Sequence, residues 1–176
     1  MNLLETKIET ERLLLIPVSL EYKEDMFREF TSEITQFMFP KPAQKVEDAE
    51  IFIDGALEKM IAGKDLVCMV LKKNDREYLG NAGLHHIDTT KPELGIWIKK
   101  SAHGNKYGRE AMEALKKWAD EHLDYEYISY PVDKKNIASR KIPESMGGVV
   151  GREYKLTGMG GQELDEVEYW IYKNSN

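Results

Sequence analysis

The stretch SAHGNKYGREAMEALKKWADEH, residues 101–122, combines glycines and cations with an amphipathic pattern. After Glu110 its apolar residues recur at helical spacing with charged residues between them, which predicts an amphipathic helix. The preceding residues 93–99 are typical of a strand, so the glycine-containing segment 100–107 must connect the strand to the N-terminus of the helix. Unpaired backbone N–H groups and the positive end of the helix dipole converge at such a junction. The stretch therefore predicts an anion-binding loop between a strand and a helix.

The composition indicates an acidic protein with local positive charge. A chain of 176 residues suits one domain, residues 1–176, with a substantial core. A net charge of -6 argues against a general nucleic-acid binder, which normally carries a basic surface. Lysines and arginines nevertheless gather in segments 99–117 and 134–141. Such clusters favour a small phosphorylated ligand, with ordinary solvated helix faces as the alternative.

The N-terminus and the cysteine count bear on location and metal binding. The opening residues MNLLETKIETERLLLIP carry acidic side chains where a secretory signal needs a basic leader and a long apolar run. No stretch approaches the roughly 20 apolar residues of a membrane helix, so we expect a cytoplasmic protein without a membrane partner. Cys68 is the only cysteine, which excludes an internal disulfide and a cysteine zinc site. We expect Cys68 to be a buried core residue and no metal to be bound.

Hydrophobic periodicity and turn residues predict an alternation of strands and helices along the whole chain. The expected strands are 12–18, 66–71, 78–87, 94–98, 125–132, 149–156 and 167–172. The expected helices are 20–31, 46–61, the helix that follows residue 107, and 136–146, with a loop at 37–42. Neighbouring short strands such as 66–71 and 78–87 are expected to pair as hairpins. This order indicates an α/β protein with a mixed sheet.

Two segments carry the functional signal. The loop GNKYGR at 104–109 lacks the spacing of the common nucleotide-binding fingerprints. The second segment, VDKKNIASRKIPESMGG at 132–148, joins a strand end to a short helix that a glycine pair terminates. With ETERLLLIP, ELGIWI and HGNKYGREA before it, in the expected order and spacing, the sequence resembles the GNAT N-acetyltransferase superfamily. Within it, the chain is similar to the branch that acetylates the N-termini of ribosomal proteins.

The resemblance covers nearly the whole chain and implies a fold and a ligand. The fold would be a mixed sheet of about seven mostly antiparallel strands, splayed between the fourth and fifth, with about four helices. The ligand would be acetyl-coenzyme A as co-substrate, its pantetheine arm pairing with the backbone of the fourth strand. The residues implied to bind it are Ile96, Trp97, Ile98, His103, Gly104, Asn105, Lys106, Tyr107, Gly108, Arg109, Asn136 and Ser139.

This chain departs from the family pattern at two positions. Lys106 replaces a glycine of the pyrophosphate loop, which costs about 1 kcal/mol if that position needs a positive φ and otherwise adds a charge near the phosphates. Pro143 occupies the position where many relatives have a tyrosine that protonates the departing thiolate. The resemblance then assigns this role to Ser139, one turn earlier. A serine bonded to its own backbone is the alternative, as helix capping is for Asn136.

Acetyl transfer to an amine also needs a base and an acceptor pocket. The resemblance places Glu93 at a recurring glutamate that acts through water, and His85 and His86 lie on the neighbouring strand. Because successive strand residues face opposite sides, at most one of the two histidines faces the acceptor. The aromatic residues of segments 37–39 and 169–170 lie in regions that approach the acceptor, although core packing explains them as well.

These observations predict a cytoplasmic N-acetyltransferase that moves the acetyl group directly to a primary amine, without a covalent enzyme intermediate. The expected catalytic residues are Glu93 and Ser139. The acceptor stays open among a protein N-terminus, a polyamine, an amino acid and an amine antibiotic. The alternative is a coenzyme A-binding sensor or scaffold without activity. Lys106 and Pro143 support it, because they are the two departures from the family pattern. A homodimer fits the family, although no residue of the sequence indicates one.

Overall fold

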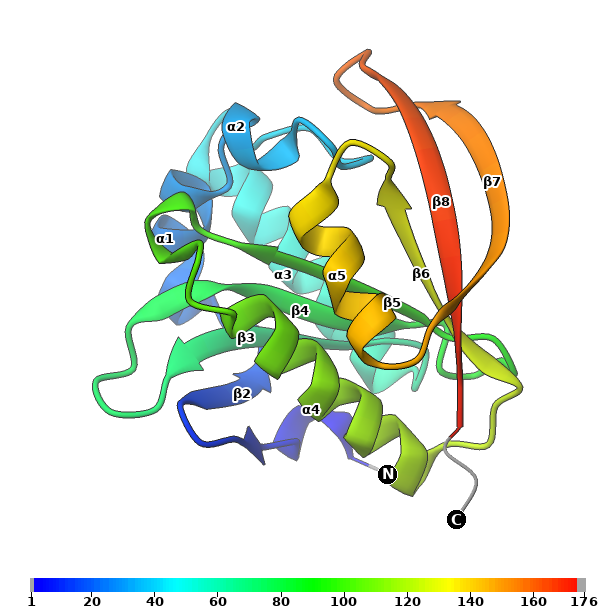
Figure 1. Cartoon of the computed structure of the whole chain (residues 1–176). Coiled ribbons are helices and arrows are strands. Elements are labelled where there is room, and N and C mark those ends of the chain that lie inside the picture. Colours follow the sequence, from blue (N-terminus) through cyan, green and yellow to red (C-terminus); the bar gives the residue numbers. More distant parts are fainter. Residues whose placement is uncertain (1, 174–176) are drawn as a thin grey trace.

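The computed structural model describes residues 2–173, which form a mixed sheet of eight strands in the order β1-β2-β3-β4-β5-β6-β8-β7 (Figure 1). The strands are β1 (Ile8–Glu9), β2 (Leu13–Pro17), β3 (Leu66–Lys72), β4 (Tyr78–His85), β5 (Glu93–Ile98), β6 (Tyr127–Asp133), β7 (Val149–Thr157) and β8 (Glu163–Tyr172). The α-helices are α1 (Lys23–Glu29), α2 (Ser32–Thr35), α3 (Val46–Ile61), α4 (Tyr107–His122) and α5 (Ile137–Ser145). Short 3-10 turns occupy Leu3–Glu5, Leu20–Tyr22 and Lys100–Ala102.

The sheet opens between β5 and β6. All other neighbouring strands pair antiparallel, whereas β5 and β6 run parallel and share one register pair, Glu93 with Ser129. Beyond that pair the two strands diverge, and α5 lies beside the opening (Figure 1). The expected mixed sheet, splayed between its fourth and fifth strands, is confirmed. The short β1 shifts the numbering by one, so the expected fourth and fifth strands are β5 and β6.

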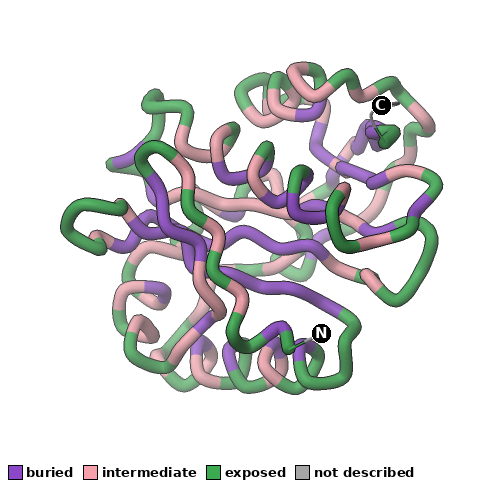
Figure 2. The backbone as a smooth tube through the Cα atoms, turned by 90° about the horizontal axis from the view of Figure 1, so that it is seen from below, coloured by how far each residue is buried: buried purple, intermediate pink, exposed green. Residues whose placement is uncertain are grey.

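Helices cover both faces of the sheet. The helix α4 packs in front of β2, β4 and β5 in Figure 1, and α3 lies behind the sheet against β3. The buried side of α4 consists of small and medium apolar residues, among them Ala111, Met112, Leu115 and Ala119, all fully buried. Figure 2 shows the buried colour running along the central strands between exposed helical turns. The predicted amphipathic pattern therefore produces the expected packing of a helix on a sheet.

Several element ends differ from the sequence prediction for tertiary reasons. The expected helix 20–31 is a 3-10 turn followed by α1, which stops at Glu29 because Phe30 leaves the helical region. The Phe30 ring packs on Trp97 of β5, with centroids 4.9 Å apart. The strand expected to reach residue 87 ends at His85, since His86 adopts a positive φ of 57°. Contacts between elements override the local pattern at both places, and α2 and β1 had no predicted counterpart.

Three further findings concern membranes, metals and the cysteine. Among residues 2–173 no helix is long and apolar enough to cross a bilayer. The same residues hold no group of three or more side chains that could ligate a metal ion. Cys68 is fully buried in β3, as expected, and burial raises the pKa of its thiol to about 12. Such a thiol is protonated at neutral pH, so Cys68 is not a nucleophile.

Candidate active site

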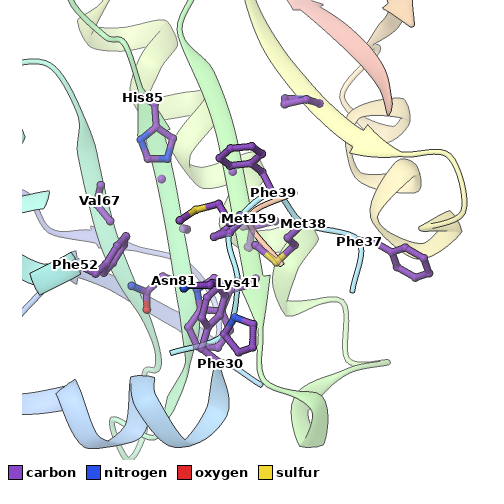
Figure 3. Close-up of a pocket in the computed structure, with 18 of the residues that line it drawn as sticks. Phe30, Phe37, Met38, Phe39, Lys41, Phe52, Val67, Asn81, His85 and Met159 are labelled. Carbon is purple, nitrogen blue, oxygen red and sulfur yellow. The ribbon is translucent and has the colours of Figure 1, made fainter. Parts of the chain in front are cut away.

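A cavity of about 910 Å³ lies where β5 and β6 diverge. Its lining brings together Glu93, Ile96 and Trp97 of β5 with Asn136 and Ser139 of the α5 segment. These residues come from two distant parts of the sequence. Figure 3 shows the end of the cavity that aromatic and methionine side chains enclose.

Alternate residues of β5 present their backbone groups to the opening. The Lys99 N–H donates to Leu79 in β4, and Trp97 pairs with Asn81 of the same strand, so the odd-numbered residues of β5 face β4. The backbone groups of Ile96 and Ile98 therefore point toward β6, which does not pair with them. Trp97 contributes its side chain to the cavity instead of its backbone.

The loop between β5 and α4 has the geometry of an anion site. Lys106 precedes α4 with φ of 62°, and Gly104 also has a positive φ of 82°. The first helical bond of α4 runs from Glu110 N–H to Lys106 O, which leaves the N–H groups of Tyr107, Gly108 and Arg109 without intrahelical acceptors. The position of Lys106 thus does need a positive φ, and a lysine there carries strain of about 1 kcal/mol. At the start of the same loop, His103 donates from Nε2 to Ile98 O at 2.7 Å.

A brace from the N-terminal segment holds this loop, and the sequence analysis missed it. The Arg12 guanidinium donates to Asn105 O at 3.1 Å and to Glu110 Oε2 at 2.7 Å, and it lies 4.7 Å from the centroid of the Tyr107 ring. Burial alone would raise the pKa of Glu110, but hydrogen bonds from Thr10 and Arg12 outweigh it and lower that pKa. The segment ETERLLLIP, where the resemblance begins, contains both Thr10 and Arg12 and was the available signal.

Most cations of the predicted basic clusters are neutralised by neighbouring carboxylates. Lys100 pairs with Glu33 at 2.6 Å and Arg109 with Glu113 at 2.8 Å. The ammonium groups of Lys99, Lys116, Lys117 and Lys134 also form ion pairs. Within the described part of the chain, Lys106 forms no ion pair. The local excess of positive charge at the loop is therefore concentrated near Lys106.

The start of α5 positions a serine next to a buried tyrosine. Asn136 caps the helix by accepting from Ser139 N–H at 3.2 Å. The Ser139 hydroxyl lies 2.9 Å from the Tyr130 hydroxyl, and both residues line the cavity. Burial raises the pKa of Tyr130 to about 12, although its bond with Ser139 opposes the shift. Pro143 lies within the same helix, as predicted, and leaves the Ser139 carbonyl without its helical donor. Tyr130 was not a sequence candidate because nothing in the motif marks a residue on β6.

Glu93 and His85 face each other across β4 and β5. Their register pair brings both side chains to one wall of the cavity. Burial raises the pKa of Glu93, while the nearby histidines oppose the shift. The Nδ1 atom of His85 lies 3.0 Å from Asp65 Oδ2, and an alanine Cβ at Gly83 would lie 2.5 Å from His85 Nε2. The imidazole therefore lies against the sheet, over a glycine that leaves it room.

Asp65 organises this region from the end of the α3–β3 connection. Only 3% of its surface is exposed. Burial alone would raise its pKa, but the bonds from the His85 ring and the His86 N–H outweigh burial and hold the pKa below its usual range. His86 follows β4 with a positive φ and does not line the cavity, so only His85 of the two histidines faces it.

A second carboxyl group lines the same cavity. Glu166 of β8 is 8% exposed and accepts a hydrogen bond from the Tyr154 hydroxyl at 2.9 Å. Burial is the main cause of its raised pKa, and the nearby Glu93 adds to the shift. Two carboxyl groups with raised pKa values in one cavity are typical of a functional site. No sequence motif marks Glu166, because hairpin pairing alone brings it to the opening.

The expected acceptor residues divide into two groups. Phe37, Met38 and Phe39 line the cavity. Tyr169 instead bonds Arg140 and Glu144, and Trp170 stacks on Tyr127 with centroids 4.5 Å apart. Of the two explanations for residues 169–170, the structure therefore supports core packing, because their side chains contact α5 and β6 and do not line the cavity.

The sequence matches the family model described as "Acetyltransferase (GNAT) domain" over residues 12–149. The chain therefore belongs to the GNAT acetyltransferase family, and the predicted enzyme class is confirmed at that level. No curated protein sequence matches the chain.

Solved structures share this fold at low sequence identity. The RimL ribosomal L7/L12 α-N-protein acetyltransferase, in complex with coenzyme A, has a TM-score of 0.83 and 14% identity, covering 97% of this chain and 100% of that one. A GNAT-family acetyltransferase from Bacillus anthracis has a TM-score of 0.82 and 19% identity over 97% and 100% of the two chains. The microcin C7 self-immunity acetyltransferase MccE, with acetyl-CoA and AMP, has a TM-score of 0.81 and 16% identity over 93% of each chain.

Proposed function

We propose that this chain transfers an acetyl group from acetyl-CoA to a primary amine by direct attack within a ternary complex. One observation carries the proposal: a single cavity contains the unpaired edge of β5 and the two predicted proton-transfer groups, Glu93 and Ser139. The coenzyme A and acetyl-CoA bound to the RimL and MccE relatives support the choice of co-substrate. We further propose that residues 1–176 act as one domain in the cytoplasm, with a peptide or small-molecule amine as acceptor.

The described residues fit a coenzyme A molecule. The backbone groups of Ile96 and the N–H of Ile98 at the open edge of β5 would pair with the amides of the pantetheine arm, whereas Ile98 O already accepts from His103 Nε2. The loop 103–109 and the N-terminus of α4 would hold the pyrophosphate, assisted by the charge of Lys106. Asn136, the N-cap of α5, would contact the pantetheine arm between the edge of β5 and the pyrophosphate loop.

The reaction needs two proton transfers on opposite sides of the acetyl carbon. The amine nitrogen forms a bond to that carbon while the carbon–sulfur bond breaks. Glu93 accepts the proton that the amine loses, directly or through water, and Ser139 donates a proton to the thiolate. The Tyr130 hydroxyl, bonded to Ser139, orients the serine, which regains its proton from solvent water while Glu93 releases to solvent the proton that it accepted. This assignment gives Tyr130 and Ser139 the task that relatives perform with a tyrosine at the position of Pro143.

Burial prepares Glu93 for its role as a base. An ordinary carboxylate is far weaker than an amine, whose pKa is about 10, so a raised pKa brings Glu93 closer to the pH of the reaction. His85 is the second candidate, because Asp65 bonds its Nδ1 and thereby directs the other ring nitrogen toward the cavity. The pH profiles of Glu93→Gln and His85→Gln separate the two. The acidic limb disappears in the variant that lacks the base.

Calorimetric titration with acetyl-CoA, followed by an assay of thiol release over a panel of amines, tests the proposal. We expect micromolar binding that weakens when the 3′-phosphate is removed, and thiol release with at least one amine. Binding without thiol release would favour the sensor or scaffold alternative. Absence of binding would contradict both functions.

A further inference from the structure

One end of the cavity is a chamber for a ligand on the face opposite α4. Phe30, Phe52, Met38, Phe39 and Met159 line it (Figure 3). These residues come from the C-cap of α1, from α3, from the loop before α3 and from the β7–β8 turn. Phe39, Phe52 and Met159 are about half exposed, so an apolar ligand would bury them, and aromatic rings and methionine side chains adapt to such a group.

The roof of the chamber is fastened by hydrogen bonds between segments far apart in the sequence. The Met159 N–H donates to Phe39 O at 2.7 Å, and Gln162 Nε2 donates to Met38 O at 2.6 Å. The β7–β8 turn is thereby tied to the loop before α3. These ties place Met159 and Phe39 over the chamber, where they limit the width of the group that can bind.

A buried donor without a partner lies at the far end of the chamber. Asn81 of β4 is 4% exposed and lines the cavity. Its Oδ1 accepts from the Tyr78 hydroxyl, while its Nδ2 is the one buried side-chain polar atom without a hydrogen-bond partner in the described part of the chain. Leaving such a donor unsatisfied is unfavourable. A ligand oxygen in the chamber would satisfy it.

The distance between the two ends of the chamber indicates the length of the ligand. Asn81 pairs with Trp97, and His85 pairs with Glu93 four residues away along the strand. At about 3.3 Å per residue these two pairs are roughly 13 Å apart. Hydrogen bonds at both ends take up part of this span, and the remainder accommodates an aromatic ring between an amine and an oxygen.

We propose that the acceptor is an elongated apolar amine that carries a hydrogen-bond-accepting oxygen at the end away from its nitrogen. The nitrogen lies at Glu93, the apolar body packs between Phe52 and Met159, and the oxygen accepts from Asn81 Nδ2. This inference rests on the proposed acetyl transfer and names its substrate class. It selects against small polar amines such as ethanolamine, which leave the chamber unfilled and Asn81 unpaired.

The test compares 4-methoxyphenethylamine, 4-ethylphenethylamine and ethanolamine as acceptors of the wild-type protein. The two aromatic amines have nearly the same shape, but only the methoxy compound offers an acceptor to Asn81. We expect its kcat/KM to exceed that of the ethyl compound about tenfold, and both to exceed that of ethanolamine by more. Equal or reversed values for the two aromatic amines, or a preference for ethanolamine, would overturn the inference and leave acetyl transfer standing.

Two variants and a binding measurement complete the test. Asn81→Asp keeps the oxygen that Tyr78 needs but removes the donor, so the methoxy preference should vanish. Phe52→Ala should lower kcat/KM for both aromatic amines, whereas the control Ile61→Ala, on the exposed side of the same helix, should not. Calorimetry of the two aromatic amines in the presence of coenzyme A measures the same preference without turnover. Tenfold tighter methoxy binding without any acetylation would contradict the proposed function alone.

Discussion

The two halves of the candidate site are built in different ways. The half toward α4, whose loop lies outside the cavity lining, consists mainly of backbone groups at the edge of β5 and at the N-terminus of the helix, and Arg12 and Asn136 brace it. The other half consists of side chains from several separate segments, including Glu93 and Glu166. Backbone sites tolerate many sequences as long as the elements form, whereas side-chain sites depend on each residue. The difference implies that changes in the acceptor half affect turnover more than changes in the loop affect acetyl-CoA binding.

The largest expected effect is that of Glu93→Gln. We expect kcat/KM to fall by about 100-fold or more, with loss of the acidic limb of the pH profile. That limb should lie above the ordinary carboxyl range, because burial raises the pKa of Glu93. The exposed control Glu58→Gln should leave turnover unchanged. Wild-type kinetics of the Glu93→Gln variant would show that Glu93 is not the general base of the reaction.

The same variant should be more stable than the wild type at neutral pH. A carboxyl whose pKa is raised by folding opposes folding once the pH exceeds its unfolded value of about 4.3. Removing the charge in Glu93→Gln therefore raises the melting temperature at neutral pH. The gain should vanish below the ordinary carboxyl range, where both states are protonated. A variant less stable than the wild type at neutral pH would show that neighbouring groups stabilise the ionised Glu93 by more than burial destabilises it.

A smaller effect is expected for the Ser139–Tyr130 pair. Ser139→Ala and Tyr130→Phe should each lower kcat by about 10- to 100-fold while acetyl-CoA binding stays unchanged. Each variant removes a hydroxyl without removing the Asn136 cap. The control Ser145→Ala removes a hydroxyl that bonds Ile142 O in the same helix and should keep full turnover. A variant pair that weakens only acetyl-CoA binding would assign the two hydroxyls to recognition instead of proton transfer.

Asp65→Asn tests whether the acceptor half depends on a single buried carboxylate. We expect the free energy of unfolding at neutral pH to fall by about 1–3 kcal/mol, measured by urea denaturation. Because the pKa of Asp65 is lowered in the folded protein, its contribution is complete above the unfolded value of about 3.9 and is lost as the pH falls through the folded value. The gap between the variant and the wild type should therefore narrow in acid. The control variant Asp54→Asn, at an exposed position, should have the same free energy of unfolding as the wild type.

The smallest expected effect is that of Lys106→Gly in the loop. Glycine removes the strain of the positive φ and should raise the free energy of unfolding by about 1 kcal/mol. It also removes a charge, so we expect acetyl-CoA to bind less than tenfold more weakly. Gly104→Ala, at a second positive φ, should change stability in the opposite direction. A larger loss of affinity on Lys106→Gly would show that this half depends on a side chain after all.

The sequence predicted the fold and the cofactor half more fully than the acceptor half. The helix 46–61 and the strand around residues 94–98 follow from periodicity, because each buries one continuous apolar face. The loop and Asn136 follow from local motifs. Tyr130, Glu166 and Asn81 have no local signal, since their importance comes from what they face across the opening. The choice between packing and acceptor contact for residues 169–170 also depended on the tertiary structure.

The order of the elements, the strand–loop–helix junction and the family follow from the spacing of residues along the chain. The folded arrangement set which of His85 and His86 faces the cavity, and it imposed the positive φ of Lys106. It also brought Asp65 to His85 and left one Asn81 donor without a partner. The reason is physical: hydrogen bonds and burial are set by neighbours distant in the chain, which no local pattern encodes.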